Sequence, residues 1–276
     1  PEESVDVLSV DVDQLPAKVT GFERRTSYAV VVGIGNYRDP GVPGVKYAKR
    51  DAEVVAKYLS SVAGFPAENI RLLTDEHALA ADLNKTFENW LPQKAHSSGI
   101  LFVYLVGNAV STDAGAPALL PYEGAAANGA SGGYSIKHLE EVLNRLPSRL
   151  KLIFADLSFP PPKPSAEESP KRLVWLDAKL QTKGRIVVVA SSPVASASVS
   201  SEATQHGLFT YQFLRALRGH GDANADGWVD LGEVLNYMRS RLSAAAAPLP
   251  AMELAVVPDV DLDGPVGSFP LAKIRQ

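Results

Sequence analysis

The sequence predicts an α/β fold in which a mainly parallel sheet of about six strands carries helices on both faces. Short apolar runs rich in β-branched residues alternate along the chain with amphipathic stretches of helical periodicity. The runs are apolar at successive positions, which is typical of strands that a parallel sheet buries on both faces. These predicted strands cover residues 28–34, 69–74, 100–106, 151–157 and 184–190.

The stretches between these strands predict the helices. The first is expected over about residues 46–62 and ends before Gly64, a residue common just after helices. Its apolar face carries Ala48, Ala52, Val55 and Leu59. A second helix carries Leu83, Phe87, Trp90 and Leu91 at helical spacing. Ser135 is a suitable N-cap for a third helix. Two more helices are expected over 207–218 and 233–244, and a short strand or hairpin element over 118–122.

The remaining segments suggest how the domain is bounded. Residues 1–25 are interpreted as an N-terminal arm that lays an edge strand or a loop on the main domain, residues 26–245. The proline-rich tail, residues 246–276, is expected to pack back on that domain. Prolines over 160–170 predict a loop, whereas residues 173–180 fit either a strand or a helix.

The composition excludes several classes of function. The net charge is -4 and lysines and arginines do not cluster, so nucleic-acid binding is not expected. The longest apolar runs are much shorter than the roughly 20 residues that a membrane-spanning helix needs. The chain has no cysteine, which excludes disulfides, thiolate metal ligands and a cysteine nucleophile. We expect a soluble domain, in the cytoplasm or exported, whose oligomeric state is open.

Two predicted strands end in polar residues at corresponding places. The strand over 100–106 leads to Asn108, and the strand over 151–157 leads to Ser158. Open α/β sheets build their sites at the carboxyl ends of parallel strands. Asn108 and Ser158 are therefore the first candidates for a site.

In several segments the chain resembles the bacterial members of the caspase/metacaspase family of cysteine peptidases. The resemblance is carried, in the family's order, by residues 28–37, 47–52, 101–104, 119–122, 153–156 and 207–211. It implies a caspase-like α/β/α sandwich with a catalytic dyad: a histidine after the third strand and a cysteine after the fourth. Asn108 stands in the place of that histidine, and Ser158 in the place of the cysteine.

These two replacements predict a pseudopeptidase. A hydroxyl is a poor nucleophile without a base, and an asparagine amide cannot take the proton near neutral pH. We therefore do not expect family-type peptide cleavage. Val106, Ala109 and the prolines after Ser158 also depart from the family's pattern, which favours natural loss over engineered inactivation.

The resemblance also implies what such a site could bind. The residue that matches Asp156 helps to bind a basic residue in metacaspase-like relatives, and Ala109 offers a backbone N–H where the family builds its oxyanion hole. We expect a protein or peptide partner with basic residues. The alternative role for Asp156 is to satisfy backbone donors at the strand end.

Two other functions stay open. One is a working hydrolase, either because an active parent protein was mutated to this sequence or because Ser158 acts by an unforeseen mechanism. His206 is the candidate base for that mechanism, although the simpler interpretation is that the histidines are exposed or locally hydrogen-bonded. The other is a purely structural module, whose groove is filled by its own proline-rich loop.

The most specific motif lies outside this site. Residues 222–233 match the twelve-residue EF-hand calcium loop, with Gly227 at the position of the sharp turn. The expected ligands are Asp222, Asn224, Asp226, the carbonyl of Trp228, Asp230 and Glu233. We expect calcium here, with a stabilising rather than a sensing role. The alternative is a solvated acidic turn held by side-chain–backbone hydrogen bonds.

Overall fold

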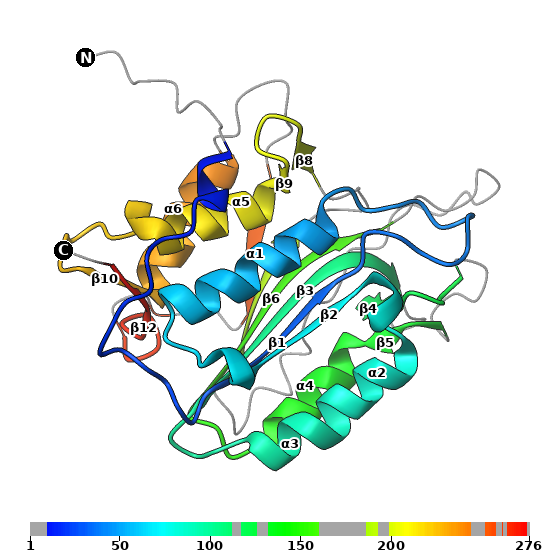
Figure 1. Cartoon of the computed structure of the whole chain (residues 1–276), viewed down its shortest axis with the longest axis horizontal. Coiled ribbons are helices and arrows are strands. Elements are labelled where there is room, and N and C mark those ends of the chain that lie inside the picture. Colours follow the sequence, from blue (N-terminus) through cyan, green and yellow to red (C-terminus); the bar gives the residue numbers. More distant parts are fainter. Residues whose placement is uncertain are drawn as a thin grey trace.

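The described residues form one eight-stranded sheet, with six strands side by side and two short ones off this path, and helices cover both of its faces (Figure 1). The computed structural model describes residues 10–111, 117–125, 132–159, 186–192, 199–243, 252–257, 261 and 264–274. The six strands are ordered β11-β7-β6-β3-β1-β2. They are β1 (Tyr28–Gly33), β2 (Ile70–Thr74), β3 (Ile100–Ser111), β6 (Leu150–Ser158), β7 (Ile186–Ser192) and β11 (Glu253–Val257). All neighbours run parallel except β11, which pairs antiparallel with β7.

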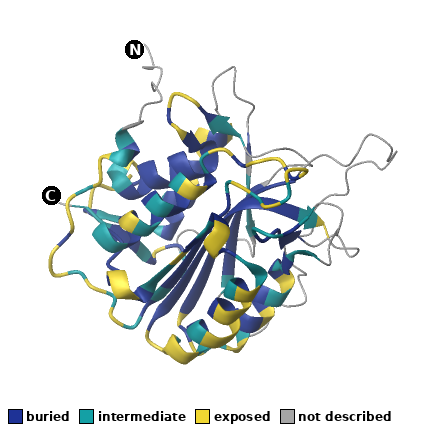
Figure 2. Ribbon diagram, turned by 45° about the vertical axis from the view of Figure 1, so that its right-hand side comes forward, coloured by how far each residue is buried: buried dark blue, intermediate teal, exposed yellow. Residues whose placement is uncertain are grey.

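The helices form two layers, one on each face of the sheet. One layer holds α1 (Ala48–Ser61), α5 (Leu208–Arg215) and α6 (Leu231–Ser243). The other holds α2 (Ala80–Asn84), a π-helical stretch η4 (Lys85–Trp90), α3 (Leu91–Lys94) and α4 (Ile136–Arg145). Figure 2 shows buried strands between helices whose outer faces are exposed. The predicted α/β fold is confirmed.

Alternation along β6 divides the interior into two cores. Leu152 and Phe154 pack with α1, α5 and α6, whereas Ile153 and Ala155 pack with the opposite layer. Continuing this alternation places Asp156 and Ser158 on the α1 and α5 face. The predicted cap of α4 is confirmed, because the Ser135 hydroxyl accepts the N–H of His138 at 3.3 Å.

Short strands complete the edges of the domain. β4 (Pro117–Leu119) pairs antiparallel with the end of β3 and with β5 (Tyr134–Ser135). β8 (Ser200–Ser201) pairs with β9 (His206–Gly207), just before α5. The tail provides two strands that the sequence did not indicate: β11, and β12 (Pro270–Lys273), which pairs with β10 (Trp228–Asp230).

The described part of the N-terminal arm, residues 10–25, contains a short 3-10 helix, η1 (Val10–Asp13), and no strand. Val12 is fully buried, and its carbonyl accepts a hydrogen bond from Tyr58 on α1. Arg218 donates to the carbonyls of Asp11 and Gln14. The arm is therefore held on the α1 and α5 layer. Residues 160–170 and 173–180, expected as a loop and as a strand or helix, lie outside the described residues.

Candidate functional site

Asn108, near the carboxyl end of β3, and Ser158, the last residue of β6, are brought together as expected. Asn108 and Ser158 are direct register partners on adjacent parallel strands. Both are buried, with exposed fractions of 1% and 6%. The structure therefore places them side by side at the carboxyl end of the sheet, where α/β folds build their sites.

The amide of Asn108 is used to hold the loop between β1 and α1. Its Nδ2 donates to the carbonyl of Pro43 at 2.6 Å, and its backbone N–H donates to the Tyr37 hydroxyl at 2.6 Å. Gly107 has φ +156, and a Cβ there would lie 3.0 Å from that hydroxyl. The Asn108 side chain therefore acts here as a hydrogen-bond donor that holds this loop.

Asp156, the expected contact for a basic residue, faces the interior. Its exposed fraction is 0%, and its Oδ1 accepts a hydrogen bond from the Ser191 hydroxyl on β7 at 2.9 Å. Because no part of the carboxylate reaches the surface, this geometry supports an internal acceptor. Ala109 is also buried and pairs in register with Leu119 on β4.

His206 lies in a separate polar cluster on the α1 and α5 face. Its Nδ1 is 2.5 Å from Oδ1 of Asp51, and its Nε2 is 3.3 Å from Oδ1 of Asp13. Asp51 Oδ2 accepts the backbone N–H of Gly207 at 3.1 Å. Burial raises the pKa of Asp51 even though His206 and Gly207 favour its charged form. Both ring nitrogens are thus engaged by carboxylates, which does not support His206 as a base for Ser158.

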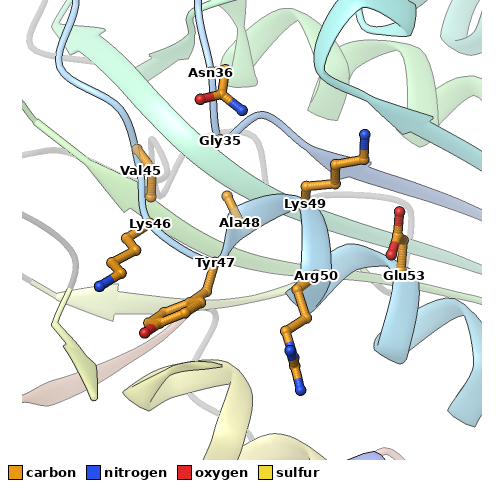
Figure 3. A pocket seen from close by; sticks show the side chains of 9 residues that line it. All are labelled: Gly35, Asn36, Val45, Lys46, Tyr47, Ala48, Lys49, Arg50 and Glu53. Carbon is orange, nitrogen blue, oxygen red and sulfur yellow. The ribbon is translucent and has the colours of Figure 1, made fainter. Parts of the chain in front are cut away.

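An open pocket lies on the loop that Asn108 holds (Figure 3). It encloses about 450 Å³ and is lined by Gly35, Asn36, Val45, Lys46, Tyr47, Ala48, Lys49, Arg50 and Glu53. Figure 3 shows the three basic side chains extending in different directions from the loop and the first turn of α1.

The accessible charges of this pocket are mainly positive, but each cation has a carboxylate neighbour. Lys46 pairs with Glu202 and Lys49 is 3.7 Å from Asp75. Arg50 is 2.6 Å from Asp13 on the arm. The sequence did not indicate this pocket, since only the adjacent Lys49 and Arg50 hint at a basic surface.

Asp75 determines the shape of the same loop. Its Oδ1 accepts the backbone N–H groups of Gly35 and Asn36 at 2.8 and 3.1 Å, and it lies after β2. Asp75 is buried and has φ 42, an unusual conformation for a residue with a side chain. Residues at or after the carboxyl ends of β1, β2, β3 and β6 therefore all make contacts at the same end of the sheet.

The loop over 222–233 follows the π-helical stretch η7 (Ala216–His220), contains β10 and ends in the first turn of α6. Glu233 accepts backbone N–H groups from Ala223, Asn224 and Asp230. Asp222 accepts those of Asp226 and Gly227. In the described part of the chain, no three acidic or histidine side chains converge into a ready metal cage.

Comparisons with known proteins agree with this architecture. The family model described as the caspase domain matches residues 26–260. Protein GSU0716 from Geobacter sulfurreducens has a similar structure, with 12% identity, a TM-score of 0.59, and coverage of 90% of this chain and 99% of that one. Caspase-1 from Spodoptera frugiperda gives 11% identity, a TM-score of 0.56, and coverage of 88% and 92%. The search of curated proteins found no significant match. Among the described residues, no helix is long and apolar enough to cross a membrane.

Proposed function

Because this chain belongs to the family of proteins with a caspase domain, we propose that it is a pseudopeptidase of that family, which binds a protein or peptide partner without cutting it. The observation that carries the proposal is the pairing of Asn108 with Ser158 near the carboxyl ends of β3 and β6. A nucleophile–base unit needs a group that accepts the proton of the nucleophile. The Asn108 amide instead donates to Pro43.

Loss of both members of such a unit leaves little catalysis. Removing one member of a nucleophile–base unit costs several orders of magnitude in rate. The contacts of both His206 ring nitrogens with carboxylates support a structural role for this histidine. The proposal is therefore that neither Asn108 nor His206 serves as a base for cleavage and that the domain acts by binding.

A partner would lie along the carboxyl edge of the sheet. Lys46 and Lys49 are exposed there and Arg50 is half-buried, whereas Asp156 is fully buried. Recognition of a basic residue through Asp156 requires this carboxylate to become accessible. Binding of a basic residue through Asp156 therefore requires a local opening of the domain. Binding of an acidic partner by the cations of the pocket does not.

The experiment is fluorescence polarisation with labelled peptides that differ only in one position, occupied by Arg, Glu or Ala. The pseudopeptidase proposal expects saturable binding of at least one peptide, recovered intact by mass spectrometry. Asp156→Asn should abolish a preference for Arg, while Lys49→Gln should weaken a preference for Glu. Absence of binding for all three peptides would favour the second candidate, a structural module.

The structural module is supported by the burial of Asn108, Asp156 and Ser158. These side chains make internal contacts, such as the hydrogen bond between Asp156 and Ser191, and such contacts stabilise a domain without any ligand. Peptide binding separates the two candidates, because only a pseudopeptidase with a groove retains it.

We further infer that the loop over 222–233 binds calcium and stabilises the domain. Its carboxylate and carbonyl oxygens are the donors that Ca²⁺ prefers, at the EF-hand spacing. Gly227 has φ +85, which suits the sharp turn at the sixth loop position. Oε1 of Glu233 accepts two backbone N–H groups, whereas Oδ1 and Oδ2 of Asp222 accept one each and keep a further lone pair for an ion. Binding to the folded state alone would raise stability by mass action.

A further inference from the structure

The strands β1, β3 and β6 all begin at the opposite end of the sheet (Figure 1). A second basic hollow lies there. It encloses about 310 Å³. Its lining is Glu23, Arg24, Arg25, Thr26, Ser27, Ser98, Ile100, Arg149 and Phe269. The strands run parallel, so this hollow is separated from Asn108 and Ser158 by the length of the sheet.

Two arginines share one aromatic ring in this hollow. The Arg24 guanidinium lies 5.0 Å from the centre of the Phe269 ring, and that of Arg149 lies 5.5 Å from the same centre. Phe269 itself is buried, with an exposed fraction of 5%. The ring attracts both cations and holds them at one place in the hollow.

The positive charge of this pair is not balanced within the described part of the chain. Arg24 donates to the backbone carbonyls of Ala63 and Pro270, and no carboxylate there forms an ion pair with it or with Arg149. The nearby carboxylate of Glu23 pairs with Arg25 at 2.7 Å. Burial lowers the pKa of Arg24 to about 10, and the charge of Arg149 adds to this effect, which reflects the cost of burying a guanidinium beside a second cation.

Two hydroxyls line the hollow beside the two cations, and that of Ser98 is also hydrogen-bonded to Nδ1 of His96 at 2.9 Å. The hydroxyls of Thr26 and Ser98 lie 3.2 Å apart, and Ser98 is exposed. The chain before β1 is pressed against the start of β3, since a Cβ on Gly99 would lie 1.8 Å from the Thr26 carbonyl. The backbone N–H of Arg149 donates to the Gly99 carbonyl at 2.9 Å. Backbone contacts therefore pre-organise the segments that carry Arg24, Ser98 and Arg149.

We propose that this hollow binds a phosphate group, presented as orthophosphate or as a small phosphomonoester. A phosphate monoester carries about -1.5 to -2 charges near neutral pH and has several acceptor oxygens. Two guanidinium groups are therefore better neutralised and hydrogen-bonded by one phosphate than by one carboxylate. The Arg149 guanidinium can bind such an oxyanion through paired N–H groups, while Arg24, whose Nε and Nη2 donate to backbone carbonyls, contributes its charge and its remaining N–H groups. The proposal does not depend on peptide binding at the other end of the sheet.

The test is a titration with sodium phosphate at constant ionic strength and without calcium, followed by calorimetry and by the thermal midpoint. Sodium acetate serves as the singly charged comparison, and glycerol phosphate tests the ester form. We expect saturable phosphate binding that raises the midpoint more than acetate does. Tighter binding of glycerol phosphate would identify an ester as the ligand, and equal or weaker binding would identify free phosphate.

The decisive variant is Arg149→Gln, because Arg149 is exposed and its loss leaves the Arg24 contacts intact. It should weaken phosphate binding by about tenfold to a hundredfold, the expected effect of one charge-assisted contact. Arg145→Gln removes an exposed arginine from the end of α4, and Lys46→Gln tests the other basic pocket. Both of these control variants should bind phosphate as tightly as the unmodified chain does. Equal binding by Arg149→Gln, or a phosphate response no larger than that of acetate, would overturn the proposal.

Discussion

His206 and Asp51 form a fully buried pair in which Nδ1 of the imidazole lies 2.5 Å from Oδ1 of the carboxylate. The partners are far apart in sequence, and they join the start of α5 to α1. Asp13 faces the other ring nitrogen, so the same histidine also holds the N-terminal arm. This arrangement explains a buried polar residue at this position without a catalytic role.

Replacing His206 by Gln should lower the free energy of unfolding by about 2–4 kcal/mol. The change leaves the buried Asp51 carboxylate without its imidazole partner, and breaking a buried pair is costly. Urea denaturation measures this loss. His138→Gln is the matched control, since His138 forms an exposed pair with Glu88 and should change stability by less than about 1 kcal/mol. Equal effects of the two variants would contradict the structural role of His206.

Glu140 should make the domain less stable as the pH rises. Burial, with Glu141 adding to it, raises the pKa of Glu140 to about 8 from an ordinary value of 4.5. Between these two pH values the unfolded chain loses this proton while the folded chain keeps it. The free energy of unfolding therefore falls over that window and levels off above pH 8.

Glu140→Gln tests this effect. The variant should be more stable than the unmodified chain at pH 8 by on the order of a few kcal/mol, and the advantage should nearly vanish at pH 4.5. Denaturation at several pH values gives the comparison. Glu68→Gln changes an exposed carboxylate and should show no such slope. A pH-independent difference for Glu140→Gln would refute the assignment.

Calcium should raise the thermal midpoint by roughly 5 °C at concentrations far above its dissociation constant. Asp226→Asn should reduce this response, because it removes a ligand charge while an oxygen remains to accept the N–H of Trp228. Scanning calorimetry with calcium, with magnesium and with a chelator makes the comparison. The calcium proposal fails if both ions give the same shift, or if the variant responds as fully as the unmodified chain.

Gly33 should not tolerate a side chain, because α1 packs directly on β1 there. A Cβ on Gly33 would lie 2.4 Å from Cβ of Ala52 and 2.5 Å from the carbonyl oxygen of Ala48. Gly33→Ala should cost roughly 3 kcal/mol of stability. The double change with Ala52→Gly should recover only part of this loss, since the backbone contact remains. Full recovery would show that Ala52 alone limits the approach of α1.

The strands and helices that could be predicted are those with strong local patterns. The parallel strands β1, β3 and β6 are apolar on both faces, and α1 has one continuous apolar face. β11 could not be found this way, because a short edge strand in a proline-rich tail is selected by its pairing with β7.

Only the part of the site that lies on the predicted strands could be predicted from the sequence. Asn108 and Ser158 lie near the carboxyl ends of adjacent parallel strands, so register brings them together. The burial of Asp156 depends on Ser191 from β7, and the basic pocket depends on a loop held by Asp75. Such contacts between distant segments leave no local signal in the sequence.

The most direct test is hydrolysis of fluorogenic peptides that end in Arg or Lys, measured with and without calcium. The unmodified chain is compared with Ser158→Ala and with the double variant Asn108→His, Ser158→Cys, after thermal melting has shown that each is folded. We predict no cleavage by the unmodified chain and measurable cleavage by the double variant, because only the latter has a base and a thiol at the paired positions. Cleavage by the unmodified chain that Ser158→Ala abolishes would contradict the pseudopeptidase account.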